Sequence, residues 1–430
     1  MTEDRAGIDH VILAFAASNN TAGFQPKIPI STIRSEFSNA KVMIAIGGWG
    51  DDYGFSPAVA SETAMATWAL GVAEMLRTTG ADGVDIDWEY PGGNGANYKQ
   101  NPNSGKVREI EGFPKLLGAT RQAIGKDKLL SIAVPGLERD MIAFTEQTGP
   151  KVWPHVDYIN IMSYDLMNRR DNVTKHHTSV AGATKTIENY LRIGVPPEKI
   201  NIGFASYAKW FTTQGDCGSK PLNCPIVQAE DPVTGKDAGT SGAWTFEDAH
   251  MKPINQNQIQ TSMDGTCGPE KMAKCSTGCC SQYGNCGTSQ EHCMGGCQFA
   301  FGSGCQGADV QGSWIRAQAN GILDEKEGGM YYFDKKESLF WTWDTPELIK
   351  RKFQDIVQTY ALGGVMAWSL GEDSYDWSHI KQIAAELSDV GYRKHDVVLN
   401  DEENTLTGDY VYGDGHSPDS GVWSEWYKRE

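Results

Sequence analysis

The chain has 430 residues, of which 40% are hydrophobic and 22% are charged, so it carries enough apolar material for a large core and is not mainly disordered. No apolar run approaches the ~18 residues that a membrane span needs. The 38 basic residues are outnumbered by 55 acidic ones, and the net charge of −17 excludes the basic footprint of a duplex nucleic-acid binder. The length fits two or three domains, or one (β/α)8 barrel of ~250 residues with additions.

Short apolar, β-branched segments alternate with helical stretches along most of the chain. Strands are predicted at residues 10–16, 41–46, 83–88, 129–134, 156–161, 200–204 and 363–370. Helices are predicted at residues 62–77, 113–124, 184–191 and 346–360. Nearly continuous apolar runs are typical of parallel strands covered on both faces, and the alternation predicts an α/β fold, a TIM (β/α)8 barrel. The first strand of the eight is missing, and we expect its place to be before His10.

The alternation stops near Tyr207 and resumes near Pro346. Inside this gap, residues 330–343 are aromatic with a polar turn in the middle, which predicts a hairpin-like insertion before the last strand. The last 35 residues hold nine acidic and two basic residues and little periodicity, which is typical of a solvated tail. We therefore predict four regions: a discontinuous barrel (1–210 and 330–392), an insertion loop (211–266), a small disulfide-rich module (267–305) and an acidic C-terminal tail (393–430).

All ten cysteines lie between Cys217 and Cys305. An even number at this density indicates disulfides formed in an oxidising compartment. A zinc site is disfavoured because adjacent cysteines, Cys279 and Cys280, are awkward ligands for one tetrahedral ion, and we predict no metal. The acidic start of the chain is not a signal peptide. The disulfides and the absent first strand together indicate that residues before Met1 are missing and that the protein is secreted.

The most informative segment is the strand that ends in Asp85-Ile86-Asp87-Trp88-Glu89. Side chains alternate along a strand, so Asp85, Asp87 and Glu89 share one face. Three neighbouring carboxyl groups cannot all ionise freely, so at least one pKa is raised, as a general acid near neutral pH requires. Metal binding and a purely structural role are the alternatives, and no histidine in the motif supports the first.

This segment resembles the signature D-x-x-D-x-D-x-E of glycoside hydrolase family 18, the chitinases, with Asp82, Asp85, Asp87 and Glu89 followed by Tyr90-Pro91. Three further segments, at residues 45–49, 162–165 and 364–369, resemble the third, sixth and eighth strands of that family in the same order. The resemblance covers roughly residues 6–387 apart from the cysteine segment. The stretches ADGVDIDWEYPGG and MNRRD…KHH resemble the fungal killer-toxin-like group of the family.

The resemblance implies substrate-assisted hydrolysis with retention of configuration, an exception to the usual scheme of two protein carboxylates. Glu89 would protonate the glycosidic oxygen while the N-acetyl carbonyl of the substrate attacks the anomeric carbon. Asp87 and Tyr164 would hold the acetamide group, and Asp85 would tune Asp87. The implied substrate-binding residues are Trp49, Tyr90, Met162, Asp165, Tyr207 and Trp368, with Trp368 as an apolar floor. No cofactor is implied.

Three further residues, Lys209, His176 and His177, lie near these motifs. Lys209 stands where relatives often carry arginine, which is a departure from the pattern. His176 and His177 could suggest a metal site, but neighbouring side chains point apart, so we favour a structural or substrate-loop role.

The cysteine segment resembles hevein-type chitin-binding modules through C-C-S-x-x-G-x-C-G, beginning at Cys279. Sequence alone cannot choose among the connectivities of eight cysteines. The resemblance implies the pairs Cys267–Cys280, Cys275–Cys286, Cys279–Cys293 and Cys297–Cys305, which leaves Cys217–Cys224 outside the module. Ser281 and Tyr283 match the sugar-binding residues of such modules. Asn285 and His292 replace the usual aromatic residues, so we expect weak chitin binding, with a purely structural insertion as the alternative.

We therefore predict a secreted, monomeric chitinase that cleaves β-1,4 linkages between N-acetylglucosamine units, with chitin or its oligosaccharides as partner and no nucleic-acid or membrane partner. A chitin lectin that has lost turnover on the same barrel, and a related endo-β-N-acetylglucosaminidase, are the alternative hypotheses. Glu89, Asp87 and Tyr164 are all present, which favours the enzyme over the lectin.

Overall fold

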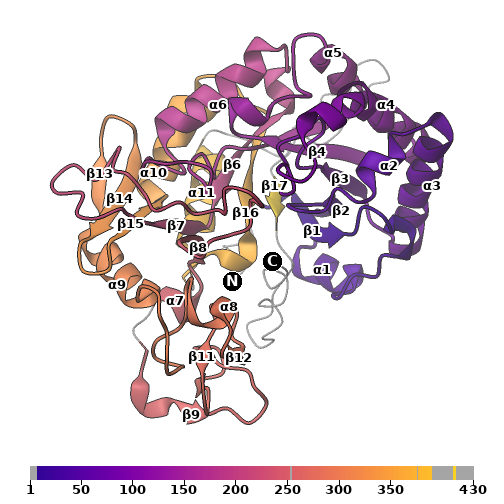
Figure 1. The fold of residues 1–430 in the computed structure, drawn as a ribbon. Coiled ribbons are helices and arrows are strands. Elements are labelled where there is room, and N and C mark those ends of the chain that lie inside the picture. The colour runs from indigo at the N-terminus through magenta and orange to yellow at the C-terminus, as the bar shows by residue number, and fades with distance from the viewer. Residues whose placement is uncertain (1–6, 252–253, 375, 390–409, 413–430) are drawn as a thin grey trace.

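The computed structural model describes every residue except 1–6, 252–253, 375, 390–409 and 413–430. A curled parallel sheet occupies its centre, and the strand order runs around the ring in sequence order (Figure 1). The strands are β1 (His10–Ala16), β2 (Lys41–Gly47), β3 (Gly83–Asp87), β4 (Leu129–Pro135), β5 (Tyr158–Met162), β6 (Ile200–Ala205), β16 (Gly364–Trp368) and β17 (Tyr410–Tyr412). The predicted α/β fold with a curled parallel sheet is confirmed.

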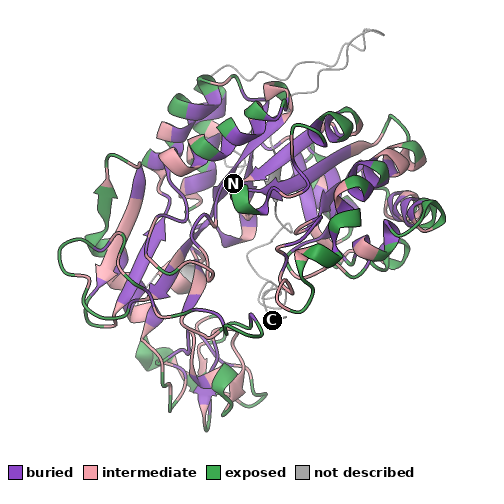
Figure 2. Cartoon of the chain, turned by 45° about the horizontal axis from the view of Figure 1, so that its top comes forward, coloured by how far each residue is buried: buried purple, intermediate pink, exposed green. Residues whose placement is uncertain are grey.

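Strands β1 to β6 and β16 consist mostly of buried residues, drawn in purple in Figure 2. Their outward side chains pack against helices and their inward side chains fill the ring. Residues on both faces can therefore be apolar, which explains the almost continuous apolar runs in the sequence. The longest helices around the ring are α3 (Glu62–Thr79), α4 (Val107–Ile124), α6 (Val180–Arg192) and α11 (Ser378–Asp389). The shorter helices are α1 (Ile30–Glu36), α2 (Phe55–Ala58), α5 (Gly149–Val152), α7 (Asp248–Met251), α8 (Gln290–Cys293) and α10 (Pro346–Lys352).

Local chemistry sets the ends of these helices. The Ser61 hydroxyl accepts a hydrogen bond from the Ala64 amide (3.1 Å) at the start of α3, and Gly80 ends the helix with a φ of 75°. Helix α4 begins six residues before the predicted start at Phe113. Pro114 lies inside the helix.

The position of the missing strand is filled by β17, which pairs in parallel with both β1 and β16. Tyr410 lies opposite His10 on one side and opposite Met366 on the other. The predicted solvated tail is therefore wrong for these three residues. The acidic composition of the whole segment hides a short Tyr-Val-Tyr run of high β propensity, and a strand needs only its backbone to pair. The rest of the predicted tail lies outside the described residues.

A second sheet lies beside the ring and is antiparallel, in the order β13 (Ile322–Asp324), β14 (Gly329–Asp334), β15 (Leu339–Trp343), β7 (Tyr207–Thr212) and β8 (Ser241–Thr245). The predicted aromatic hairpin is β14–β15, with Met330 opposite Trp343. Helix α9 (Val310–Asn320) packs on this sheet through Trp314, whose ring lies 5.0 Å from that of Trp341. Its aromatic side chains therefore form a separate small core.

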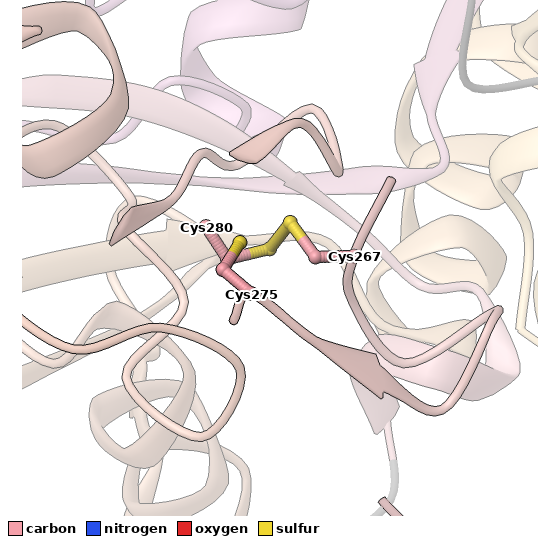
Figure 3. A group of neighbouring side chains, drawn as sticks. All are labelled: Cys267, Cys275 and Cys280. Carbon is pink, nitrogen blue, oxygen red and sulfur yellow. A yellow bond between two sulfur atoms is a disulfide. The ribbon is translucent and has the colours of Figure 1, made fainter. Parts of the chain in front are cut away.

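The cysteine segment forms a disulfide-rich region below the second sheet in Figure 1, with the short strands β9 (Gln260–Thr261), β10 (Ala273–Lys274), β11 (Cys279–Cys280) and β12 (Cys286–Gly287). The cysteines pair as 217–224, 267–280, 275–286, 279–293 and 297–305, which are the five pairs that the resemblance implies. The sulfur atoms of Cys267, Cys275 and Cys280 lie within 4.8 Å of one another (Figure 3). All three belong to disulfides, so they are not free thiolate ligands for a metal.

Among the helices of the described residues, none is both long enough and apolar enough to cross a bilayer.

Candidate active site

Three acidic residues rise along β3 and its carboxyl end. Asp85 is fully buried and Asp87 is 4% exposed, and the alternation of the strand turns both toward the inside of the ring. Glu89 follows two residues after Asp87, where the strand has ended. The register places Ala45 and Ser131 on either side of Asp85. A column of carboxyl groups therefore leads from the interior to the rim.

The lowest carboxyl group, Asp85, is held by amide and hydroxyl donors from neighbouring strands. Ser131 donates its hydroxyl to Asp85 Oδ1 at 2.5 Å, and the Asn160 side-chain amide donates to the same oxygen at 3.0 Å. Asn201 donates in turn to Asn160 Oδ1 at 2.9 Å. Hydrogen bonds to a carboxylate favour its charged form, so this buried chain stabilises Asp85 as an anion.

Asp87 has the opposite environment. Its Oδ1 atom is buried and has no hydrogen-bond partner among the described residues. Burial raises the pKa of Asp87 well above its usual value, and the negative charges of Glu89 and Asp85 raise it further. The raised pKa favours the protonated form of Asp87, and its Oδ1 atom is open to another partner.

Glu89 occupies the rim. Burial raises the pKa of Glu89 to about 7, opposed by a hydrogen bond with Tyr90, while the charges of Asp165 and Asp140 add to the rise and that of Arg170 counters it. A carboxyl group with this pKa can donate a proton and take one back near neutral pH. Glu89 thus has the acid–base property of a general acid in a water-poor site.

Tyr164 and Asp165 follow β5, and Met162 is its last residue. The Tyr164 ring is buried and meets the Tyr207 ring edge-on at 6.1 Å. Burial would raise the pKa of Asp165, but the Lys209 ammonium (3.1 Å), His177 and the Tyr207 hydroxyl (2.8 Å) outweigh it and hold the pKa well below its usual value. Asp165 is therefore an anion fixed in position beside Tyr164.

Aromatic side chains flank the carboxyl column on two sides. Trp368, at the end of β16, stacks against Phe15 at 5.5 Å. Trp49 follows β2, is 44% exposed and meets the Tyr90 ring at 6.4 Å. A flat, exposed indole is suited to contact with the apolar face of a sugar ring. The structure thus brings Trp49, Tyr90 and Glu89 together at one part of the rim, and Trp368 and Tyr164 at strand ends further round the ring.

The family model described as glycosyl hydrolases family 18 matches residues 2–373. The chain belongs to glycosyl hydrolase family 18. Among curated proteins, it is 28% identical to mouse chitotriosidase-1 over 228 residues, covering 47% of each chain, and 23% identical to chitinase B of Serratia marcescens over 391 residues, covering 80% of this chain and 66% of that protein. The chain spans about half the length of several of the curated relatives it matches.

Solved structures show the same fold. A chitinase from Rhizomucor miehei has a TM-score of 0.62 at 17% identity and covers 90% of this chain and 95% of its own. A mutant of the Ostrinia furnacalis group II chitinase catalytic domain 2, solved with a chito-oligosaccharide, has a TM-score of 0.59 at 18% identity and covers 88% of each chain.

Several residues of this family 18 site were not predicted from the sequence. Ser131 and Asn160 contact Asp85, and Asn201 contacts Asn160, only because the sheet register brings four strands together. Asp140 and Arg170 lie on loops after β4 and β5, and both act on the pKa of Glu89. The sequence offered no signal for these loop residues, since no spacing rule links one barrel loop to another.

The histidine pair behaves as the spacing suggests. His176 turns outward to Asp324, with Nε2 3.2 Å from the carboxylate. His177 is fully buried and turns inward, with Nδ1 3.6 Å from Asp165. The two rings point apart and share no common ligand position.

In the disulfide-rich region, Ser281 is 4% exposed, and its hydroxyl accepts a hydrogen bond from the Asn285 amide at 3.2 Å. Tyr283 is partly exposed, and Asn285 donates to its carbonyl at 3.4 Å. Phe299 is 43% exposed in the same region and was not predicted as a surface aromatic. The serine hydroxyl therefore has an internal partner, and the exposed rings are Tyr283 and Phe299.

Proposed function

We propose that the chain hydrolyses β-1,4 linkages of chitin and chito-oligosaccharides with retention of configuration. The observation that carries this proposal is the carboxyl column on β3, in which Asp85 accepts two hydrogen bonds, the pKa of Asp87 is raised well above its usual value and the pKa of Glu89 is raised to about 7. Membership of family 18 and the chitinases among its relatives support the same substrate.

In the first step, Glu89 gives its proton to the glycosidic oxygen as the bond from that oxygen to the anomeric carbon breaks. The acetamide carbonyl oxygen of the same sugar forms a bond to the anomeric carbon and gives an oxazolinium ion. In the second step, the water oxygen attacks the anomeric carbon as the bond from that carbon to the acetamide oxygen breaks, and the water gives a proton back to Glu89. The two displacements on opposite faces retain the configuration.

Asp87 and Tyr164 act on the acetamide group. The unpartnered Oδ1 of Asp87 accepts a hydrogen bond from the acetamide N–H, and its shared proton moves toward Asp85 as positive charge develops on the oxazolinium. The Tyr164 hydroxyl donates to the acetamide carbonyl and orients it for attack. Asp85 tunes Asp87 through the short column that they share.

The remaining residues bind and orient the sugars. Trp368 forms the floor beneath the distorted ring, and Met162 packs beside it. Asp165 accepts a hydrogen bond from the same sugar, and its ion pair with Lys209 keeps it ionised. Tyr207 holds Asp165 in place, while Tyr90 and Trp49 contact the sugar beyond Glu89.

The disulfide-rich region is proposed to be a hevein-like module that contributes weak chitin binding through Tyr283. Its pairings support this proposal, and the internal hydrogen bond of Ser281 limits its contribution. Five disulfides fit an oxidising environment and support secretion. The segments at 81–93 and 167–177 support membership of the killer-toxin-like group.

The experiment is hydrolysis of N-acetylchitotetraose by the wild type and by Glu89→Gln, with the anomeric configuration of the first product followed by NMR. We expect the variant to lose a factor of about 10³ or more in kcat, because the general acid is removed. Glu111→Gln, which changes an exposed ion pair with Lys151, is the matched control and should keep wild-type turnover. Equal turnover by wild type and Glu89→Gln would contradict the assignment. Chitin binding without turnover by either would favour the lectin.

A further inference from the structure

Two loops that are distant in the sequence meet at the rim beside Trp49. One is residues 97–100, in the loop after β3, and the other is residues 230–236, in the insertion after β7. Lys99 donates its ammonium to the Pro232 carbonyl at 2.8 Å, and Gln100 donates its side-chain amide to the Thr234 carbonyl. Gly235 packs against the Lys99 side chain. We call these two joined segments the rim bridge.

A single buried carboxylate, Glu230, holds the rim bridge together. Its residue is 6% exposed, and the Tyr98 hydroxyl donates to its Oε1 atom. Three cations surround it, with distances of 3.7 Å to Lys99, 3.9 Å to Arg169 and 4.0 Å to Arg170. A carboxylate that has been removed from water needs compensating positive charges, so loss of these cations would destabilise the junction.

Arg170 links the rim bridge to the site. Its guanidinium lies 4.1 Å from the Tyr98 ring centre and 5.4 Å from that of Trp49, and it donates to the Asn94 and Gly95 carbonyls at 2.8 and 2.9 Å. Planar cations stack on aromatic faces in this way. The loop after β5 is thereby fixed to the loops after β2 and β3.

The strand order shows what these contacts span. In the ring, β3 and β4 lie between β2 and β5 (Figure 1). A contact between Trp49, which follows β2, and Arg170, which follows β5, therefore passes over the carboxyl ends of the two strands between them. Glu89 stands at one of these ends. The contacts therefore join the loops after β2 and β5 across the part of the rim to which Glu89 belongs.

We propose that the rim bridge closes the leaving-group side of the sugar groove, so that the enzyme acts on chain ends and short oligosaccharides and cleaves internal bonds of long chitin chains poorly. The proposal rests on the proposed function. In that function the acetamide-bearing sugar lies toward Trp368 and Tyr164, and the departing sugars lie on the other side of Glu89, where Trp49 and Arg170 stand. A long chain that continues past this point meets residues 97–100 and 230–236.

The test uses the full chain with two variants that open the rim bridge, Glu230→Gln and the double variant Lys99→Ala with Gln100→Ala. Neither change touches the carboxyl column. Lys335→Ala, which removes an exposed ion pair with Asp216 on the outer part of the second sheet, is the matched control. Hydrolysis of N-acetylchitotetraose is measured beside the fall in viscosity of a soluble chitin derivative per reducing end released.

We expect both bridge variants to hydrolyse N-acetylchitotetraose at a rate within about twofold of the wild type. The viscosity loss per bond cleaved should rise at least about threefold, because internal bonds of the long chain become accessible. An unchanged ratio in two folded variants, with normal tetramer hydrolysis, would overturn the closure and leave the proposed function standing. Absence of tetramer hydrolysis by the wild type would overturn both.

Discussion

The parallel ring and the disulfide-rich region reach stability by different physical means. The ring buries an extended set of aliphatic and aromatic side chains from strands and helices. The disulfide-rich region buries its own cysteines around a single fully buried phenylalanine, Phe301. A segment this poor in apolar surface cannot offset its chain entropy by burial and needs cross-links. The ring, in contrast, buries enough apolar surface to hold the carboxyl groups of Asp85 and Asp87 in its interior as well.

This difference predicts that loss of a disulfide destabilises the disulfide-rich region and leaves the stability of the ring unchanged. Changing both Cys279 and Cys293 to alanine removes a disulfide that joins residues 14 positions apart in the sequence. The loss of this cross-link is expected to destabilise the disulfide-rich region by about 3 kcal/mol. Calorimetry and hydrogen exchange should show loss of protection within residues 267–305 alone. Tetramer hydrolysis should be unchanged.

The control for this prediction is removal of Cys217–Cys224, whose sequence separation is only 7 and whose loss should therefore matter less. A fall in the melting temperature of the ring on losing Cys279–Cys293 would contradict the separation. It would mean that the disulfide-rich region supports the ring.

The stability of the ring is expected to depend on pH. Glu372 is 7% exposed, and its Oε2 atom has no hydrogen-bond partner among the described residues. Burial, followed by the charge of Glu247, raises the pKa of Glu372 to about 8, while its ordinary value is 4.5. A raised carboxyl pKa stabilises the folded state below the ordinary value, and this stability is lost as pH rises through the folded value.

We therefore expect the melting temperature of the ring to fall between pH 5 and pH 8, with Glu372 contributing on the order of 2–4 kcal/mol to the change. In Glu372→Gln, which stays neutral, this fall should be smaller, and the variant should be more stable than the wild type at pH 8. The disulfide-rich region serves as the internal reference, because its cross-links do not titrate. Parallel melting curves for wild type and variant from pH 5 to pH 8 would contradict the role of Glu372.

The two regions also differ in what their sequences disclosed. The strands of the ring were predictable because apolar runs mark them, and the acidic face of β3 was predictable because alternation along a strand is independent of context. Strand β17 was missed because three residues of Tyr-Val-Tyr carry too little pattern within an acidic segment. The partners of Asp85 were missed because Ser131 and Asn160 become neighbours only through the register of the sheet. Arg170 and Glu230 were missed because loop-to-loop contacts leave no periodic signal.

The smallest expected effect concerns those missed partners. Asn160→Leu keeps the branching of the side chain at Cγ but removes one of the two donors that hold Asp85 Oδ1. With one donor fewer, the charged form of Asp85 is less well supported, and the proton shared between Asp85 and Asp87 is held less well in place. We expect kcat to fall about tenfold with little change in KM, and the acidic limb of the kcat profile to move to higher pH.

Asn201→Leu is the graded comparison, because Asn201 reaches Asp85 only through Asn160 and should move the profile less. Both substitutions remove hydrogen bonds from the same buried layer, so both are expected to lower the stability of the fold, and a stability measurement cannot show which residue acts on Asp85. The pH profile of kcat can show this, because only a residue that acts on the charge of Asp85 shifts the profile. If wild type and a correctly folded Asn160→Leu variant have the same pH profile of kcat, Asn160 and Asn201 contribute only to packing. Asp85 would then act on Asp87 without their help.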